Sequence, residues 1–277
     1  MFEKFSRSWA LVKASAELLR SDKQLLLFPA ISGAATLLVL ATFLVPVFAL
    51  RIFESGFGIG GALLSFLFYF CQYGVIVFFN CALVGAAMIR LDGGDPTLRD
   101  GLDAAISRLP SILSYAAIAA TVGVLLQSLK GRDNDLIVRL VGSGLGAAWT
   151  LATFLVVPVL VSRDLGPVDA LKQSVALLRR TWGENAIGNV GIGAAFGLIT
   201  FAVLAAGMLL AFAAWQVSGA LAVLVGIVFV IAVLLLGVYQ AALSGIYSAV
   251  LYRYAVAHEI PVQFPGGLLE HAFDRKV

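Results

Sequence analysis

Charged residues are scarce in this chain of 277 residues: only 13% are Asp, Glu, Lys or Arg, whereas 61% are hydrophobic. Soluble domains are about half apolar and about a quarter charged. A soluble fold could not bury this much apolar surface, so the composition argues against a soluble domain and indicates lipid as the surrounding solvent. The net charge of +3 is too small to favour binding to nucleic acid.

Cysteine and histidine are almost absent, with two residues of each. Cys71 and Cys81 would lie about 15 Å apart along a helix, which excludes a disulfide between them. His258 and His271 each have a glutamate as neighbour, but adjacent side chains point apart on a helix. A zinc site needs three or four converging ligands. We therefore expect no metal and no cofactor.

Patterns typical of catalysis are equally few. The stretch LDGGDP (91–96) has a superficial likeness to an intramembrane aspartyl protease motif, but it comes at the end of an apolar run. Its aspartates are typical of turns and helix caps. A serine nucleophile needs a base within reach, and neither histidine falls within an apolar run. We expect a protein that is not an enzyme and has no catalytic residues.

Long apolar runs are what the chain does contain. A membrane-spanning helix needs about 20 apolar residues. The chain has six runs of about this length or longer, at 25–50, 59–90, 111–129, 136–162, 187–214 and 219–252. The first is too long for a signal peptide, and the second and last should tilt or project beyond the hydrocarbon. The pattern predicts an all-α polytopic membrane protein whose six transmembrane helices form three hairpins.

Lysine and arginine are unevenly shared among the segments outside these runs. Fifteen lie in the N-terminal segment, the second and fourth connections and the C-terminal segment, against four in the alternate connections. Basic residues are retained on the cytoplasmic side of a membrane. We therefore expect a multi-pass protein of the inner or plasma membrane with both termini in the cytoplasm.

Each predicted hairpin follows a segment with the pattern of an amphipathic helix. The first segment covers 2–19, the second begins at Asp95–Pro96 and ends at Pro110, and the third covers 166–182, with its stripe starting at Val168. Apolar residues recur at steps of three and four, which places them on one helix face. We expect cytoplasmic interfacial helices, anchored at the membrane surface by the following aromatic and basic residues: Trp9, Trp182, Lys172, Arg179 and Arg180.

Two of these segments also match residue by residue. KASAELLR (13–20) and KQSVALLR (172–179) share Lys, Ser, Leu, Leu and Arg. An alternative is that any two interfacial helices look alike. We predict a single membrane domain, 1–277, with three approximate repeats followed by a cytoplasmic tail, at 1–90, 91–162, 163–252 and 253–277.

Three stretches carry a resemblance to a known family. They are SRSWALVKASAELLRSDKQLLLFPAISG (6–33), LYRYAVAHEIPVQF (251–264) and LLEHAF (268–273). They resemble a bacterial and archaeal membrane protein family classified as domain of unknown function 6159. GPVDALKQSVALLRRTW (166–182) also resembles the membrane domain associated with glycerophosphodiester phosphodiesterases. The first resemblance implies a multi-pass membrane fold and no assigned catalytic residues.

Polar side chains inside the predicted spans are Gln72, Asn80 and Gln240. Such residues either hydrogen-bond between helices or line a polar cavity, and both interpretations stay open. Gly193 and Gly197 show a spacing that lets helices approach closely.

We expect a non-enzymatic integral membrane protein that organises the membrane or interacts with a partner or lipid. Anionic lipids of the cytoplasmic face are the expected partners, because the surface helices are basic. The alternative is a transporter or channel for a small apolar or lipid-like solute. The sequence does not predict a protein partner or an oligomeric state.

Overall fold

The computed structural model describes the backbone of residues 2–49, 59–130, 136–180 and 182–257. Side-chain surroundings are described for 12–45, 60–126, 144–179 and 191–256. All regular structure in these ranges is helical. In chain order, the elements are α1 (Phe2–Ser21), η1 (Lys23–Leu26), α2 (Leu27–Ala49), α3 (Ile59–Leu91), α4 (Leu98–Ser107), α5 (Leu109–Lys130), α6 (Leu136–Thr153), α7 (Val156–Ser162), α8 (Pro167–Arg180), α9 (Trp182–Trp215) and α10 (Gly219–Ala257).

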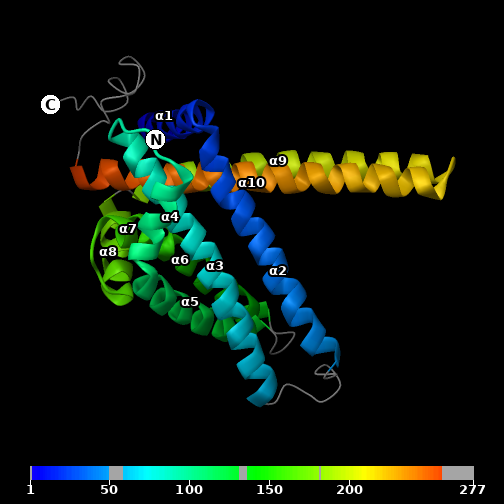
Figure 1. The fold of residues 1–277 in the computed structure, drawn as a ribbon, viewed down its shortest axis with the longest axis horizontal. Helices are drawn as coiled ribbons and strands as arrows, with labels where there is room; N and C mark the ends of the chain where they lie inside the picture. Colours follow the sequence, from blue (N-terminus) through cyan, green and yellow to red (C-terminus); the bar gives the residue numbers. More distant parts are fainter. Residues whose placement is uncertain (1, 50–58, 131–135, 181, 258–277) are drawn as a thin grey trace.

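Six helical segments of the described chain are long and apolar enough to cross a membrane. They are α2, α3, α5, the segment formed by α6 and α7, α9 and α10. This confirms the predicted all-helical fold with six apolar spans. Consecutive spans are in contact, α2 with α3, α5 with α6 and α9 with α10, and α3 also packs extensively on α5 (Figure 1). The three consecutive pairs are called helix pairs below.

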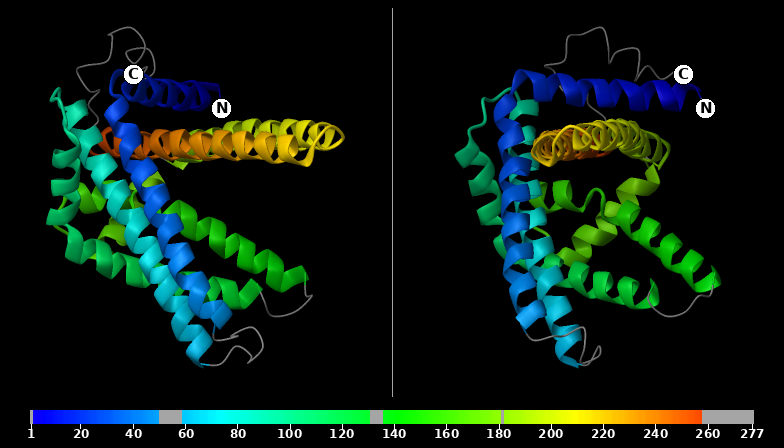
Figure 2. Two further views of the ribbon diagram at one scale, coloured as in Figure 1. Left: turned by 45° about the vertical axis from the view of Figure 1, so that its right-hand side comes forward. Right: turned by 90° about the vertical axis from the view of Figure 1, so that its right-hand side faces the viewer.

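The three helix pairs start from a common region and diverge beyond it. In Figures 1 and 2, α1, α4, α7 and α8 gather at one end of the molecule, and the pairs extend from that end in different directions. We call this common region the packed end; it includes residues 77–91 of α3 and 242–255 of α10. The pair α9–α10 projects furthest, and its residues 193–238 are called the arm.

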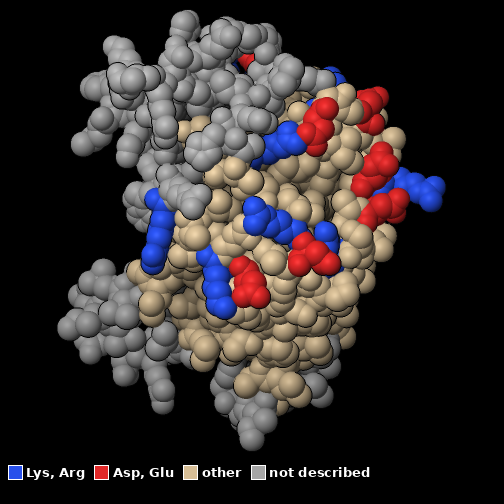
Figure 3. Space-filling view, turned by 90° about the vertical axis from the view of Figure 1, so that its left-hand side faces the viewer, with Lys and Arg blue, Asp and Glu red and all other residues tan. Residues whose placement is uncertain are grey.

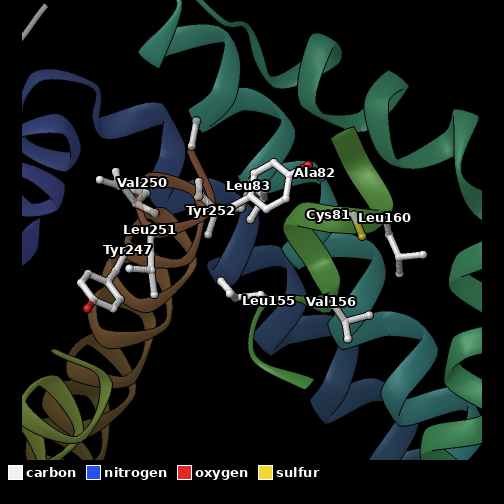
Figure 4. Close-up of a cluster of buried hydrophobic side chains, with 14 of the residues drawn as sticks. Cys81, Ala82, Leu83, Leu155, Val156, Leu160, Tyr247, Val250, Leu251 and Tyr252 are labelled. Atoms are coloured by element: carbon white, nitrogen blue, oxygen red, sulfur yellow. The ribbon is translucent and has the colours of Figure 1, made fainter. Parts of the chain in front are cut away.

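The hydrophobic core lies in the packed end and is formed mainly by the second helix of each pair. Figure 4 shows side chains from α3, α7 and α10 in this core. Leu83, Leu160 and Tyr247 represent the three helices, and each is fully buried. Leu83 also lies so close to Gly245 that a side-chain carbon at that glycine would be 2.5 Å from the Leu83 methyl group. The packed end therefore has the dense, interdigitated packing of a protein interior.

The fourth predicted span is not one continuous helix. It divides into α6 and α7, and the interruption falls at Phe154 and Leu155. Pro158 explains the position, because proline has no N–H to donate to the carbonyl of Phe154 and its ring collides with that carbonyl. The sequence interpretation of a single helix over 136–162 was wrong here. The break separates α7, which enters the core, from α6, which packs against α5 and α8.

The turn between α3 and α4 is built by glycine and a helix cap. Gly93 has φ 90°, and the Gly94 N–H donates to the Ile89 carbonyl, which is the glycine-based ending expected of a helix C-terminus. Thr97 then caps α4, where its hydroxyl accepts from the Asp100 N–H and the Asp100 carboxylate accepts from the Thr97 N–H. The predicted start of this segment at Asp95 therefore lies two residues before the actual cap.

The predicted end of the second amphipathic segment also differs from the structure. Helix α4 ends at Ser107, and Pro110 lies in the first turn of α5. Proline fits the first turn of a helix because the N–H groups there have no partner within the helix. Pro110 thus begins the next helix and does not terminate α4.

Candidate functional site: the packed end of the helices

The charged residues gather on one face of the packed end. Figure 3 shows Lys and Arg side chains alternating with Asp and Glu across this face. Two of the arginines are held in ion pairs that connect distant parts of the chain. The face is consequently a mixed surface and not a purely basic one.

Two ion pairs join segments that are far apart in sequence. Arg253, near the end of α10, pairs with Asp92 directly after α3. Arg108, between α4 and α5, pairs with Asp164 directly after α7. The two arginine side chains are mostly buried, while their aspartate partners are exposed. Each pair fastens the end of one apolar span to a different segment.

The Asp100 carboxylate has a pKa below its ordinary value of 3.8. The main cause is the hydrogen bond from the Thr97 hydroxyl, followed by the bond from the Thr97 N–H. Both bonds favour the charged carboxylate. Asp100 thus acts as a charged cap at the start of α4, and its negative charge also suits the positive end of the helix dipole.

Helix α4 packs on α3 through its smallest residues. Gly101 and Ala105 are fully buried. A side-chain carbon at Gly101 would lie 2.7 Å from the Ala82 carbonyl oxygen of α3 and would also collide with the ring of Phe28 in α2. Only glycine fits at this contact, so the backbones of α4 and α3 approach each other closely.

Helix α8 packs on the break between α6 and α7 through a serine. Ser174 is fully buried, and its hydroxyl donates a hydrogen bond of 2.6 Å to the Ala152 carbonyl. That carbonyl belongs to the last turn of α6, where the helix has no further N–H to offer it. The serine therefore satisfies a backbone group that the break leaves without a helical partner.

The buried face of α8 keeps part of its predicted apolar stripe: Leu178 is buried, and Leu171 and Val175 are partly buried. Val168, at the start of that stripe, is 52% exposed, whereas Ala170, Ser174 and Leu177 are buried. A hydropathy pattern places valine inside and serine outside. The structure departs from this order at two positions: Val168 is exposed, and Ser174 is buried where its hydroxyl bonds to the Ala152 carbonyl.

The proposed membrane anchors are described only in part. Lys172 and Arg179 are exposed, and Lys172 makes a local ion pair with Asp169 at 3.1 Å. Trp9, Trp182 and Arg180 lie outside the residues whose side chains are described. The anchoring role of these residues stays a prediction.

The three polar residues of the spans occupy different helices. Gln72 and Asn80 lie on α3, and Gln240 lies on α10. All three are partly buried, and the carbonyl oxygen of the Gln72 side chain is enclosed without a hydrogen-bond partner among the described residues. An unpaired polar atom away from water costs free energy, so this oxygen is suited to accept a hydrogen bond from a ligand or a water molecule.

Metal-binding groups do not gather within the described part of the chain: no three His, Cys, Asp or Glu side chains there could share an ion. His258 and His271 lie outside that part. The contacts described above hold helices together, and they do not bring a nucleophile next to a base.

The six apolar spans and their shared core define the chain as a helical multi-pass membrane protein. The sequence profile of the family of unknown function DUF6159 matches residues 59–261, so the chain belongs to this family. The match runs from the start of α3 to just beyond α10. No curated protein matches the chain significantly.

Proposed function

We propose that this protein is a non-enzymatic membrane protein that orders lipid around its diverging helix pairs. The arm supports this proposal. It contains no charged residue, and among its residues only Gly207 and Ala214 are buried. Phe201 and Leu209, for example, are each 71% exposed. Apolar surface of this extent requires an apolar solvent, and lipid acyl chains supply one on every side of the helix pair.

The divergence of the helix pairs gives this lipid a particular location. Outside its own pair, α9 packs mainly on α1 and α8, both of which lie at the packed end. The arm and the α5–α6 pair extend in different directions beyond that end (Figure 2). Acyl chains that occupy the space between two diverging pairs are in contact with protein on two sides. Such lipids would exchange more slowly than lipids that touch one helix.

The distribution of basic residues supports an orientation with the packed end in the cytoplasm. Lys13, Arg20 and Lys23 are exposed at α1 and at its junction with η1. Basic groups close to a membrane surface attract anionic headgroups by about 1 kcal/mol each. In this orientation α1 contacts the anionic leaflet, and lipids with negative headgroups are the preferred partners.

Electron paramagnetic resonance of spin-labelled lipids tests this function in reconstituted vesicles. We expect a motionally restricted lipid fraction larger than the perimeter of a compact six-helix bundle requires, with phosphatidylglycerol preferred over phosphatidylcholine. Replacing Lys13, Arg20 and Lys23 by Gln should reduce the headgroup preference and leave the restricted fraction unchanged. A restricted fraction no larger than that of a compact bundle would refute the proposal.

Transport of a small apolar or lipid-like solute is the second candidate, and the enclosed Gln72 oxygen favours it. A solute with one hydrogen-bond donor would satisfy this atom inside the membrane. The test uses a chain with Cys71 and Cys81 replaced by Ala and with single cysteines at Gln72, Asn80 or Gln240. Labelling of these cysteines by a membrane-impermeant thiol reagent supports a solute path. Complete protection from the reagent supports the lipid-ordering function.

A further inference from the structure

Each short helix packs on a helix pair, and the order of these contacts follows a rule. Helix α4 packs on α3, and α8 packs on α6 and α7. In both cases the short helix comes directly after the pair on which it packs. Helix α1 is the first element in chain order, and it packs on α9 and α10 of the last pair. Figure 2 shows α1 lying along this last pair.

The contacts therefore form a closed cycle. The first pair carries α4, the second carries α8, and the third carries α1. The sequence repeat groups each short helix with the pair that follows it. The packing instead groups it with the pair that precedes it, and α1 completes the cycle because the third pair has no short helix after it among the described residues.

The register of α1 on its pair matches the register of α8. The aligned serines, Ser15 and Ser174, are both 0% exposed. Leu18 and Leu177, at the next aligned position, are 7% and 6% exposed. Lys13, like its aligned residue Lys172, faces outward. Two helices that share buried and exposed positions in this way use the same face for packing.

We propose that α1 is the packing helix of the third pair, a strap that closes the ring of three units from the opposite end of the chain. Helix α9 depends on this strap, because its main contacts outside its own pair are with α1 and α8. The surface of α9 and α10 beneath α1 is a binding surface for a helix with a buried serine and leucine in the register of Ser15 and Leu18. Covalent connection between α1 and η1 is not needed for this binding.

Cutting the chain between α1 and η1 tests the strap directly. A site for a specific protease is inserted after Ser21, and the intact protein is purified in mild detergent and then cut. We expect the fragment that contains α1 to remain bound and to co-elute with the rest of the chain in size-exclusion chromatography. Release of the fragment from the otherwise unaltered sequence overturns the proposal.

Two matched variants of the cleavable protein test the register. Ser15→Leu places a large side chain at a fully buried position, so the fragment should be released at least about tenfold more readily. Lys13→Leu, two residues away on the exposed face, should leave the fragment bound. Equal retention of the fragment in the Ser15→Leu and Lys13→Leu proteins overturns the proposed register.

The protease site inserted after Ser21 could prevent the protein from folding. A circular permutant tests the same proposal without that site. The permutant begins at Lys23, continues to Val277 and then adds residues 1–22. The tail 258–277 spans up to about 66 Å when extended and serves as the linker. We expect a melting temperature like that of the natural chain, and the same loss of stability on Ser15→Leu in both chains. A permutant that does not fold, or in which Ser15→Leu has no effect, overturns the proposal.

Discussion

Glycine residues have opposite surroundings in the packed end and in the arm. A side-chain carbon at Gly85 or Gly101 would collide with a neighbouring helix, whereas Gly197 and Gly226 of the arm have no other atom within 4 Å of that position. Glycine in the packed end permits close helix approach. In most of the arm it only lowers helix stability. The effect of a glycine on this fold therefore depends on whether a neighbouring helix packs against it.

The arm has one exception to this contrast. At Gly207 of α9, a side-chain carbon would lie 2.6 Å from the ring of Phe229 in α10. This contact holds the two helices of the arm together. It does not connect the arm to the rest of the molecule, so the arm is a two-helix unit with lipid-facing residues on its other sides.

The largest difference should appear when one leucine is truncated in each region. Leu160 is fully buried in α7, whereas Leu209 in the arm is 71% exposed. Leu160→Ala should lower the free energy of unfolding by about 2–5 kcal/mol, because it leaves a cavity. Leu209→Ala should change it by less than about 0.5 kcal/mol, because lipid or detergent fills the space. Unfolding in detergent, monitored by circular dichroism, measures the free energy of unfolding of both variants. An equal loss of stability in the two variants would contradict the difference between the packed end and the arm.

Glycine substitutions should give the next largest effect, with opposite signs in the two regions. Gly101→Ala should destabilise the protein by about 1–3 kcal/mol, because the methyl group collides with Ala82 and Phe28. Gly197→Ala should stabilise it by about 0.5–1 kcal/mol, because alanine favours the helix and meets no neighbour. Thermal melting of the two variants side by side checks the signs. A stabilised Gly101→Ala protein would show that α4 is not packed on α3 as described.

An effect of similar size is expected for the hydroxyl that joins α8 to the break in the fourth span. Ser174→Ala should cost about 1–3 kcal/mol, because the Ala152 carbonyl is left buried without a partner. Ser114→Ala is the control, since that hydroxyl bonds only to its own helix at an exposed position. If both serines tolerate alanine equally in a melting experiment, the bond to Ala152 contributes nothing to stability.

The smallest expected effect is a dependence of stability on acidic pH. The pKa of Asp100 is lowered in the folded protein, so its charge stabilises the fold above the ordinary value of 3.8. That contribution is lost as the pH falls below 3.8 and through the folded pKa. Asp100→Asn should flatten the fall in melting temperature below pH 4, and Thr97→Ala should flatten it in part. An unchanged acid slope in Asp100→Asn would contradict the capping role.

Several features were predictable from the residues alone. Six apolar runs predicted six spans, and Gly166 followed by Pro167 predicted the start of α8 at Pro167. The break at Phe154 was missed because proline is tolerated in membrane helices when neighbouring groups satisfy the freed backbone. At this break the Ala152 carbonyl is satisfied by Ser174, a residue on another helix. The residues around the break do not indicate that a side chain from a distant helix will bond to its backbone.

The glycine spacing was misleading for a related reason. Gly193 and Gly197 have the spacing that favours helix packing, yet neither has another side chain or helix within 4 Å in the described structure. Gly101, which does permit a close approach, has alanine and not glycine four residues later, at Ala105. Spacing describes one helix face. Whether a second helix covers that face depends on how the chain is arranged in space.

The sequence by itself determined the solvent of this protein and the number of its spans. Both depend on the count of apolar residues along the chain, and each such residue contributes independently of its distant neighbours. Only the tertiary structure decided which faces are buried in protein and which face lipid. It placed α1 on α9 and α10 and Ser174 on the end of α6. Packing is a relation between segments far apart in the chain, so the pattern of one segment does not contain it.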